Sequence, residues 1–90
     1  MCKEDPSSWH VYMVRCADDT LYTGIAKDIR ARLDQHNNGQ GARYTRARRP
    51  VVLVYQEMAA DRGAALRREY AIKQLSPAMK RQLIAAAGIP

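Results

Sequence analysis

Residues 10–37, HVYMVRCADDTLYTGIAKDIRARLDQHN, carry the signals of two strands, a turn and a helix in close succession. Residues 9–16 alternate as a half-buried strand does, and residues 21–25 form the returning strand. ADDT, residues 17–20, is typical of a turn because aspartate side chains bond to the nearby backbone there. The first strand presents two faces, one with Trp9, Val11 and Met13 and the other with His10, Tyr12 and Val14.

The turn decides on which face of the sheet Tyr22 lies. A two-residue turn would pair Arg15 with Tyr22 and put Tyr22 on the face opposite Tyr12. A three-residue loop, or one bulged residue, would shift the register and bring Tyr22 opposite Val14, on the face of Tyr12. If both tyrosines serve one site, we expect an odd-length loop or a bulge between Cys16 and Tyr22, with an Asp or Thr in an unusual backbone conformation.

The rest of the chain adds helices and one more strand. We expect a helix from the Asp28 cap to about Asn38, ended by Gly39, and then a basic loop over 39–50 with room for one short helical turn. A strand follows over 51–58. Asp61 caps a second helix over 62–75, and a last helix starts at Ser76-Pro77 and ends before Gly88. The order β-β-α-β-α-α predicts an α+β fold, a small and mostly antiparallel three-stranded sheet flanked by helices. We expect one domain over residues 9–90, preceded by a flexible leader over residues 1–8.

Composition and charge narrow the class of protein. Fifteen Lys and Arg against nine Asp and Glu give a net charge of +6, which favours a nucleic-acid partner, although a basic protein without one is the alternative. No apolar run approaches the ~20 residues that span a bilayer, and residues 1–9 do not resemble a secretory signal. The two cysteines make no disulfide framework, and with two scattered histidines they make no four-ligand zinc site. We therefore expect a cytoplasmic protein with no membrane partner.

Two helices place charged side chains beside their apolar stripes. Arg32 and His36 lie one turn apart on the flank of the first helix, where the arginine could bind phosphate or simply cover the edge of the core. Glu69 lies on the sheet-facing side of the second long helix. It could pair with Lys73 one turn on, or it could bind a hard cation such as Mg²⁺, which commonly takes only one or two carboxylates.

The basic loop joins charge to an aromatic side chain. Tyr44 could stack on an exposed base while the surrounding arginines hold phosphates, and a solvated basic loop is the alternative. The expected nucleic-acid contacts are Arg43, Tyr44, Arg46, Arg48 and Arg49, together with Lys27.

The order of these signals resembles the GIY-YIG nuclease superfamily. Its motifs match VYM at 11–13 and YTG at 22–24, followed by Arg32 and Glu69. The stretches YTGIAKDIRARLDQHN, GARYTRARRP and ALRREYAIKQL are similar to the small stand-alone bacterial members, and the likeness covers roughly residues 9–86. VYM lacks the leading glycine, Ile25 stands where some relatives carry a lysine, and no asparagine follows the last motif helix. No lysine or asparagine of those motifs is therefore carried over.

The resemblance implies a role for each matched residue. Tyr12 and Tyr22 match the two motif tyrosines, either of which could activate or orient water, and His36 matches a polar site residue that could assist. Arg32 matches the arginine that binds the scissile phosphate, and Glu69 matches the single metal ligand. Tyr44 belongs to the GARYT segment of the subgroup.

Together these features predict a metal-dependent endonuclease that uses Mg²⁺, with Mn²⁺ able to substitute. A flexible strand fits a small site with one basic loop more easily than a stiff duplex does, so we expect cleavage of single-stranded DNA without an obligate protein partner. Flap or branched DNA and RNA are alternative substrates. A non-catalytic nucleic-acid-binding module and a protein-interaction domain are alternative functions.

Overall fold

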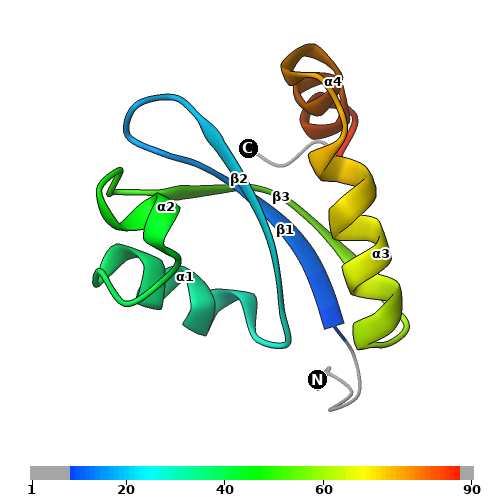
Figure 1. The fold of residues 1–90 in the computed structure, drawn as a ribbon, viewed down its shortest axis with the longest axis horizontal. Coiled ribbons are helices and arrows are strands. Elements are labelled where there is room, and N and C mark those ends of the chain that lie inside the picture. Colours follow the sequence, from blue (N-terminus) through cyan, green and yellow to red (C-terminus); the bar gives the residue numbers. More distant parts are fainter. Residues whose placement is uncertain (1–8, 88–90) are drawn as a thin grey trace.

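The computed structural model describes residues 9–87 as a three-stranded antiparallel sheet with helices on both faces (Figure 1). The strands are β1 (Trp9–Arg15), β2 (Leu21–Ala26) and β3 (Val52–Ala59), in the spatial order β2-β1-β3. The helices are α1 (Ile29–Asn37), α2 (Arg43–Arg46), α3 (Arg62–Lys73) and α4 (Pro77–Ala87). The predicted α+β class and the order β-β-α-β-α-α are confirmed, and α2 is the short helical turn in the basic loop. The predicted leader and the helix end at Gly88 lie outside the described residues.

The central strand β1 is buried on both faces and divides the core in two. Val11 and Met13 pack with apolar side chains of α3 and α4. Tyr12 and Val14 point the other way, toward apolar side chains of α1. The alternation predicted from the sequence is therefore correct, and the sheet needs helices on both sides because both of its faces are apolar.

The β1–β2 hairpin has the odd-length loop that the shared tyrosine face requires. Val14 pairs with Tyr22, and the Cys16 N–H donates to the Thr20 carbonyl at 2.8 Å, which leaves a three-residue loop over 17–19. Asp19 has the left-handed backbone conformation, with φ of 71°. Tyr12 and Tyr22 therefore lie on the same face of the sheet, as predicted.

Side-chain caps set the helix boundaries. The Asp28 carboxylate accepts a hydrogen bond from Ala31 N at 3.1 Å, and the Asp61 carboxylate accepts one from Ala64 N at 2.8 Å. Gly39, with φ of 82°, follows α1 as predicted. Other predicted boundaries differ from the observed ones by one or two residues. The two aspartate caps therefore set where α1 and α3 begin.

Candidate active site

The candidate site lies at the exposed edge of the sheet, where β2 has a neighbour on one side only. Tyr12 pairs with Gly24 on this strand, and both tyrosines face α1. A Cβ atom on Gly24 would approach the Tyr12 hydroxyl to 2.7 Å. A glycine is needed there because the Tyr12 phenol lies against the β2 backbone.

A buried chain of hydrogen bonds runs from β1 through α1 to α2. The Tyr12 hydroxyl lies 2.8 Å from His36 Nε2, and His36 Nδ1 lies 2.7 Å from Thr45 Oγ1. Thr45 Oγ1 also donates to the Ala42 carbonyl at 3.0 Å. A hydroxyl has one hydrogen, so Thr45 must accept from His36 Nδ1–H. This assignment, made from the hydrogen-bond network, leaves the His36 Nε2 lone pair to accept from the Tyr12 hydroxyl.

Burial and charge keep this pair neutral. Burial lowers the pKa of His36 below its ordinary value of 6.5, and the Arg32 guanidinium lowers it further. Burial also raises the pKa of the Tyr12 phenol, with smaller contributions in the same direction from Tyr22 and Glu69, while Arg32 acts against them. Near neutral pH, Tyr12 is therefore a protonated donor and His36 a neutral acceptor.

A glycine of the GARYT segment lets the basic loop close over His36. A Cβ atom on Gly41 would lie 2.2 Å from His36 Nδ1 and 2.8 Å from its Cα atom. Any larger residue would collide with the imidazole and with the α1 backbone. The segment therefore combines a backbone that lies against His36 with the hydroxyl of Thr45, which bonds to it.

Arg32 lies one turn before His36 at the rim of the site. Its side chain is half-buried, and its Nη1 atom donates to Gln35 Oε1 at 2.9 Å. Its positive charge influences the pKa of both Tyr12 and His36. The guanidinium is therefore close enough to act electrostatically on both members of the buried pair.

Tyr22 connects the buried chain to the basic loop. Its ring lies edge-on to His36, with centroids 5.5 Å apart, and is stacked with Tyr44 at 5.9 Å. The Arg48 guanidinium lies 4.1 Å from the Tyr44 ring centroid. Three aromatic rings thus form a continuous line from the interior to the surface.

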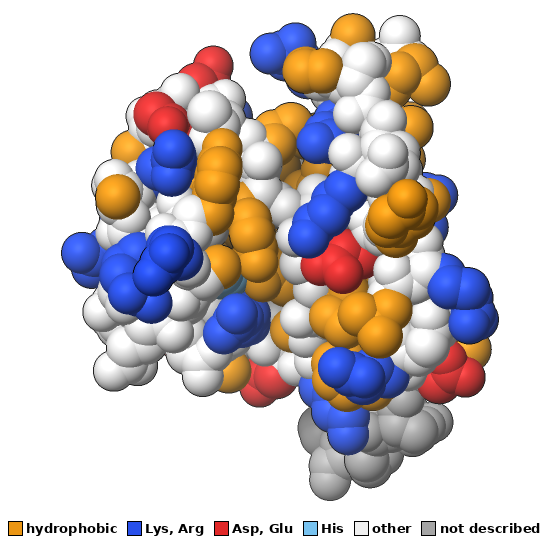
Figure 2. Space-filling model, viewed as in Figure 1, with side chains coloured by type: hydrophobic (Ala, Val, Ile, Leu, Met, Phe, Trp, Pro, Cys, Tyr) orange, Lys and Arg blue, Asp and Glu red, His pale blue; other side chains and the backbone are white. Residues whose placement is uncertain are grey.

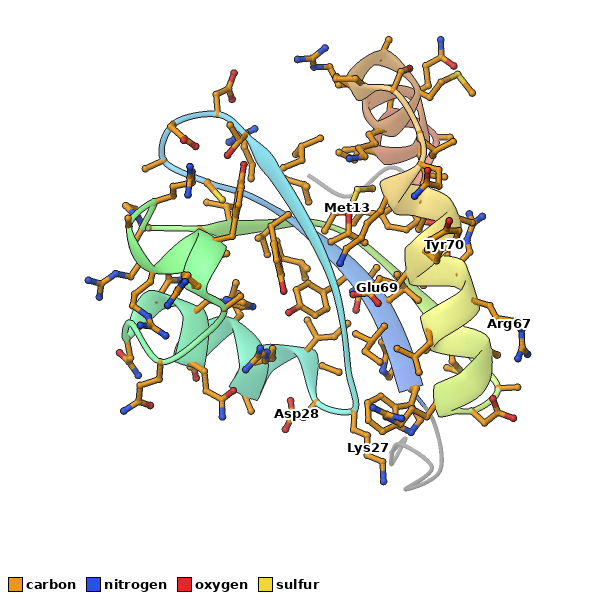
Figure 3. The ribbon with its side chains drawn as sticks, in the orientation of Figure 1. Met13, Lys27, Asp28, Arg67, Glu69 and Tyr70 are labelled. Carbon is orange, nitrogen blue, oxygen red and sulfur yellow. The ribbon has the colours of Figure 1, made fainter. Side chains whose placement is uncertain are left out.

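Glu69 reaches the same edge of the sheet from α3, on the other side of β2. Figure 3 shows Glu69 pointing toward β2, whereas Arg67 on the same helix points away. Lys73 Nζ lies 3.3 Å from Glu69 Oε2 and 6.0 Å from the Tyr22 ring centroid. The ion pair allowed by the sequence therefore forms, and it brings a lysine into the site.

A hard cation fits this donor set only in part. Over residues 9–87 no group of three or more His, Cys, Asp or Glu side chains could hold a metal ion. The Glu69 side chain retains 18% of its exposure, so solvent can reach it. One accessible carboxylate, completed by waters and substrate phosphate, is a coordination that Mg²⁺ accepts.

The side chains of two arginines in the basic loop form hydrogen bonds to other groups of the protein. Arg48 donates to Asp18 Oδ2 at 3.0 Å and to the Tyr44 carbonyl at 2.8 Å. Arg49 donates to the carbonyls of Arg46 and Asn37, at 2.9 and 3.4 Å. Both side chains therefore hold the loop in place as well as adding charge to it.

The remaining predicted contacts fall in two places. Arg43 and Arg46 are exposed on α2. Lys27 lies at the far end of β2, and Figure 3 shows it away from Glu69. Its ammonium lies 5.5 Å from the Trp9 ring centroid. The structure thus brings together Tyr12, Tyr22, Arg32, His36, Tyr44 and Glu69, but it does not bring Lys27 to the same site.

Figure 2 shows the face that carries these groups. The surface is hollowed between the side formed by α1, α2 and the hairpin and the side formed by α3 and α4. Side chains of the hydrophobic class, which in this colouring includes tyrosine, line the floor. Lys and Arg side chains flank the hollow, and an acidic group lies on its α3 side. The site is therefore open to an extended anionic ligand.

Sequence reasoning missed the roles of Thr45 and Gly41 but allowed for the pairing of Lys73 with Glu69. Thr45 orients His36, Gly41 makes room for it, and Lys73 adds a cation next to Glu69. The i, i+4 spacing of Glu69 and Lys73 was the signal for the last. The first two had only their place in GARYT, and nothing in that segment alone predicts a contact with α1.

Comparisons with known proteins find similar sequences over most of the chain. A family model described as the GIY-YIG catalytic domain matches residues 8–82. A UPF0213 protein of Desulfotalea psychrophila is 58% identical over 84 residues, which cover 92% of this chain and 76% of that protein. A UPF0213 protein of Staphylococcus aureus is 56% identical over 77 residues, covering 86% and 94%.

Two structures solved by NMR in solution share the fold. The UPF0213 protein of Bacillus halodurans superposes with a TM-score of 0.60 at 38% identity, covering 92% of this chain and 88% of that one. A protein of E. faecalis gives a TM-score of 0.63 at 32% identity, covering 93% and 90%. The sheet and its flanking helices are therefore common to these chains.

Proposed function

The chain belongs to the GIY-YIG family, in its small stand-alone UPF0213 branch, and is an endonuclease; we propose that it hydrolyses phosphodiester bonds in single-stranded DNA. The observation that carries the chemical proposal is the buried Tyr12–His36 hydrogen bond, with the imidazole as acceptor. Arg32 on α1 and Glu69 on α3 both act electrostatically on the Tyr12 phenol. His36, Arg32 and Glu69 thus supply a proton acceptor, a cation and a carboxylate around one open hollow.

The proton of the attacking water is proposed to move through Tyr12 to His36. A free phenolate is disfavoured in the resting site because burial raises the pKa of Tyr12. The phenol can still act as a base if it releases its own proton to His36 Nε2 while it accepts one from water. His36 Nε2 can take that proton because the resting imidazole is neutral and its Nδ1–H is bound to Thr45. Tyr22, packed edge-on to His36, would hold the imidazole and border the water.

Arg32 is proposed to bind the scissile phosphate. Its guanidinium can form two parallel hydrogen bonds to phosphate oxygens, and its charge would stabilise the negative charge that develops during cleavage. The same charge offsets part of the rise that burial causes in the pKa of Tyr12, which favours release of the Tyr12 proton. Arg32 would thus act on both the nucleophile and the phosphate.

Glu69 is proposed to hold the divalent cation, Mg²⁺ or, in its place, Mn²⁺. Nucleases of this family are generally metal-dependent. Such an ion would supply Lewis-acid stabilisation of the leaving oxygen. Lys73 Nζ lies 3.3 Å from the same carboxylate, so the ion would share or displace that pairing.

The proposed substrate class follows from the surface around the site. Tyr44 is 38% exposed next to the hollow, and Arg43 and Arg46 stand exposed on the same short helix. An exposed ring with adjacent cations suits unpaired bases on a flexible backbone.

No helix within residues 9–87 is long and apolar enough to cross a membrane. We propose that the protein acts in the cytoplasm, without a membrane or an obligate protein partner.

The test is cleavage of labelled single-stranded, duplex and flap DNA and of RNA, with Mg²⁺, with Mn²⁺ and with EDTA. The proposal expects cuts within the single DNA strand that depend on metal and are lost in Glu69→Gln, which keeps the shape of the side chain. Arg67→Gln, on the outer side of the same helix, is the matched control and should cut like wild type. Preferred cleavage of flap DNA or RNA would overturn the proposal that single-stranded DNA is the substrate. Metal-independent binding of nucleic acid without cleavage would indicate a binding module instead.

A further inference from the structure

A second concave feature lies where the hairpin faces α4, and we call it the α4 cavity. It has a volume of about 270 Å³ and is lined by hairpin residues 19–21, by Tyr44 and by Pro77, Lys80 and Arg81 of α4. Figure 1 shows the hairpin loop and α4 on opposite sides of this end of the molecule. The α4 residues have no place in the chemistry proposed above.

The α4 cavity is chemically asymmetric. Its α4 wall carries two cations, Lys80 and Arg81, while its hairpin wall carries the carboxylate of Asp19. That carboxylate is exposed and lies 3.9 Å from the Arg15 guanidinium. Leu21 adds an apolar side chain to the hairpin wall. An anionic group entering the cavity is therefore favoured on the α4 side and disfavoured on the hairpin side.

The size and lining suit one flat, uncharged ring attached to an anion. Pockets that enclose drug-sized ligands hold about 300–1,000 Å³, so a cavity just below that range takes a smaller group such as one nucleobase. Leu21, Pro77 and the Tyr44 ring offer apolar surface for such a ring. A phosphate linked to it could reach Lys80 and Arg81. A nucleotide unit of a strand has this combination of parts.

Tyr44 belongs to both the α4 cavity and the candidate active site. Ring contacts of 5.5 and 5.9 Å connect His36 through Tyr22 to Tyr44. The Arg48 guanidinium already lies 4.1 Å from the Tyr44 ring centroid and covers part of the ring. Because Tyr22 and Arg48 both lie against the ring, a base in the cavity would contact the part of Tyr44 that stays exposed, 38% of the residue.

We propose that the α4 cavity binds a nucleotide next to the cleaved bond, with its base against Tyr44 and Leu21 and its phosphate on Lys80 and Arg81. This deepens the proposed function, on which it rests, by naming a second anchor for the strand. A strand held both at Arg32 on α1 and on α4 would span the two sides of the hollow that Figure 2 shows. Binding energy from this remote contact would position the scissile phosphate.

The test separates binding from cleavage by using the Glu69→Gln protein. Fluorescence anisotropy with labelled oligothymidylates over a salt series compares Lys80→Gln, Arg81→Gln and Arg67→Gln in that background. Each of the three removes one positive charge, but only the first two alter the cavity. The proposal expects the salt slope to fall by about 0.7 for each lost phosphate contact in the α4 variants and to stay unchanged in Arg67→Gln.

A second measurement needs no variant of α4. Titration of oligothymidylate into ¹⁵N-labelled Glu69→Gln protein should shift the amide signals of residues 19–21, 44 and 80–81. Unmoved cavity signals, or equal salt slopes for all three charge variants, would overturn the proposal. Shifts at the cavity in a protein whose wild type cuts no nucleic acid would instead overturn the nuclease function while leaving this strand-binding site in place.

Discussion

The hydroxyl of Tyr12 lies 2.8 Å from Nε2 of His36, and both side chains are almost fully buried. A buried hydroxyl and a buried ring nitrogen would each be costly without a partner. Their pairing joins the central strand β1 to α1. Because Thr45 fixes the tautomer of His36, the bond also has a direction, from the phenol to the imidazole.

Tyr12→Phe removes that proton donor and keeps the ring. We expect the single-turnover cleavage rate to fall by about 10²–10⁴-fold, the usual worth of a general base. His36 Nε2 loses its partner, so stability should fall by about 1–3 kcal/mol in urea unfolding. Tyr22→Phe is the control and should reduce the rate much less. Equal loss in both variants would assign the base role to neither tyrosine alone.

Thr45→Val tests the tautomer of His36 without touching the proposed reacting groups. The variant keeps the shape of the side chain but removes the oxygen that accepts from Nδ1–H. Nε2 can then carry the hydrogen, and it no longer accepts from Tyr12. We expect a fall of about 10–100-fold in turnover, in the range found for groups that orient a histidine, with recovery in Thr45→Ser. A Ser variant as slow as Val would point to packing instead.

His36 also makes stability depend on pH. Its pKa is lowered in the folded protein, so the unfolded chain binds the proton first as pH falls below 6.5. The neutral imidazole thus contributes its full stability above pH 6.5, and the contribution is lost as pH falls toward and through the lowered pKa. Urea unfolding between about pH 7.5 and 5 should show a smaller loss in His36→Gln than in wild type. Parallel curves would contradict the lowered pKa.

The features predicted correctly from the sequence are those set by local chemistry. Whether the hairpin loop has an odd or an even number of residues decides on which face of the sheet Tyr22 lies. Asp18-Asp19 tolerates the left-handed backbone conformation that the odd-length loop requires. The cap at Asp28 is equally local, since an aspartate before an apolar repeat leaves few alternatives for the backbone. Such signals need no knowledge of distant contacts.

The features missed depend on contacts between distant segments. His36 was expected on the flank of α1, but its full burial arises because the loop at Gly41 and Thr45 closes over it. Arg48 and Arg49 looked like free cations, yet both bond to groups of the protein itself. The composition of a sequence gives the number of arginine charges. It does not show whether the N–H donors of an arginine already bind other groups of the same protein.

Lys73→Gln tests competition between an internal cation and a bound one. Lys73 Nζ lies 3.3 Å from Glu69 Oε2, so a divalent ion must share or displace this pairing. The lysine side chain is 47% exposed and its charge is screened, so the effect should be modest. We expect the Mn²⁺ affinity, measured by electron paramagnetic resonance, to rise by about two- to fivefold. Arg67→Gln on the same helix is the control, and weaker Mn²⁺ binding in Lys73→Gln would instead make the lysine a support for the metal site.

Gly41→Ala and Gly63→Ala are the same chemical change at sites with opposite surroundings. A methyl group at Gly41 would lie 2.2 Å from His36 Nδ1 and 2.8 Å from the His36 Cα atom, and neither can move without disturbing α1 or the Tyr12 bond. At Gly63, in the first turn of α3, the new atom would lie 3.5 Å from its nearest neighbours, which is ordinary contact. We expect Gly41→Ala to destabilise the fold by about 1–3 kcal/mol, as overpacking does. Gly63→Ala should stabilise it by about 0.5–1 kcal/mol, because alanine favours the helix.

Urea unfolding of both variants measures the contrast, and the cleavage rate should fall in Gly41→Ala alone. A neutral Gly41→Ala would mean that the loop can move off His36, and the fixed tautomer would then lose its structural basis.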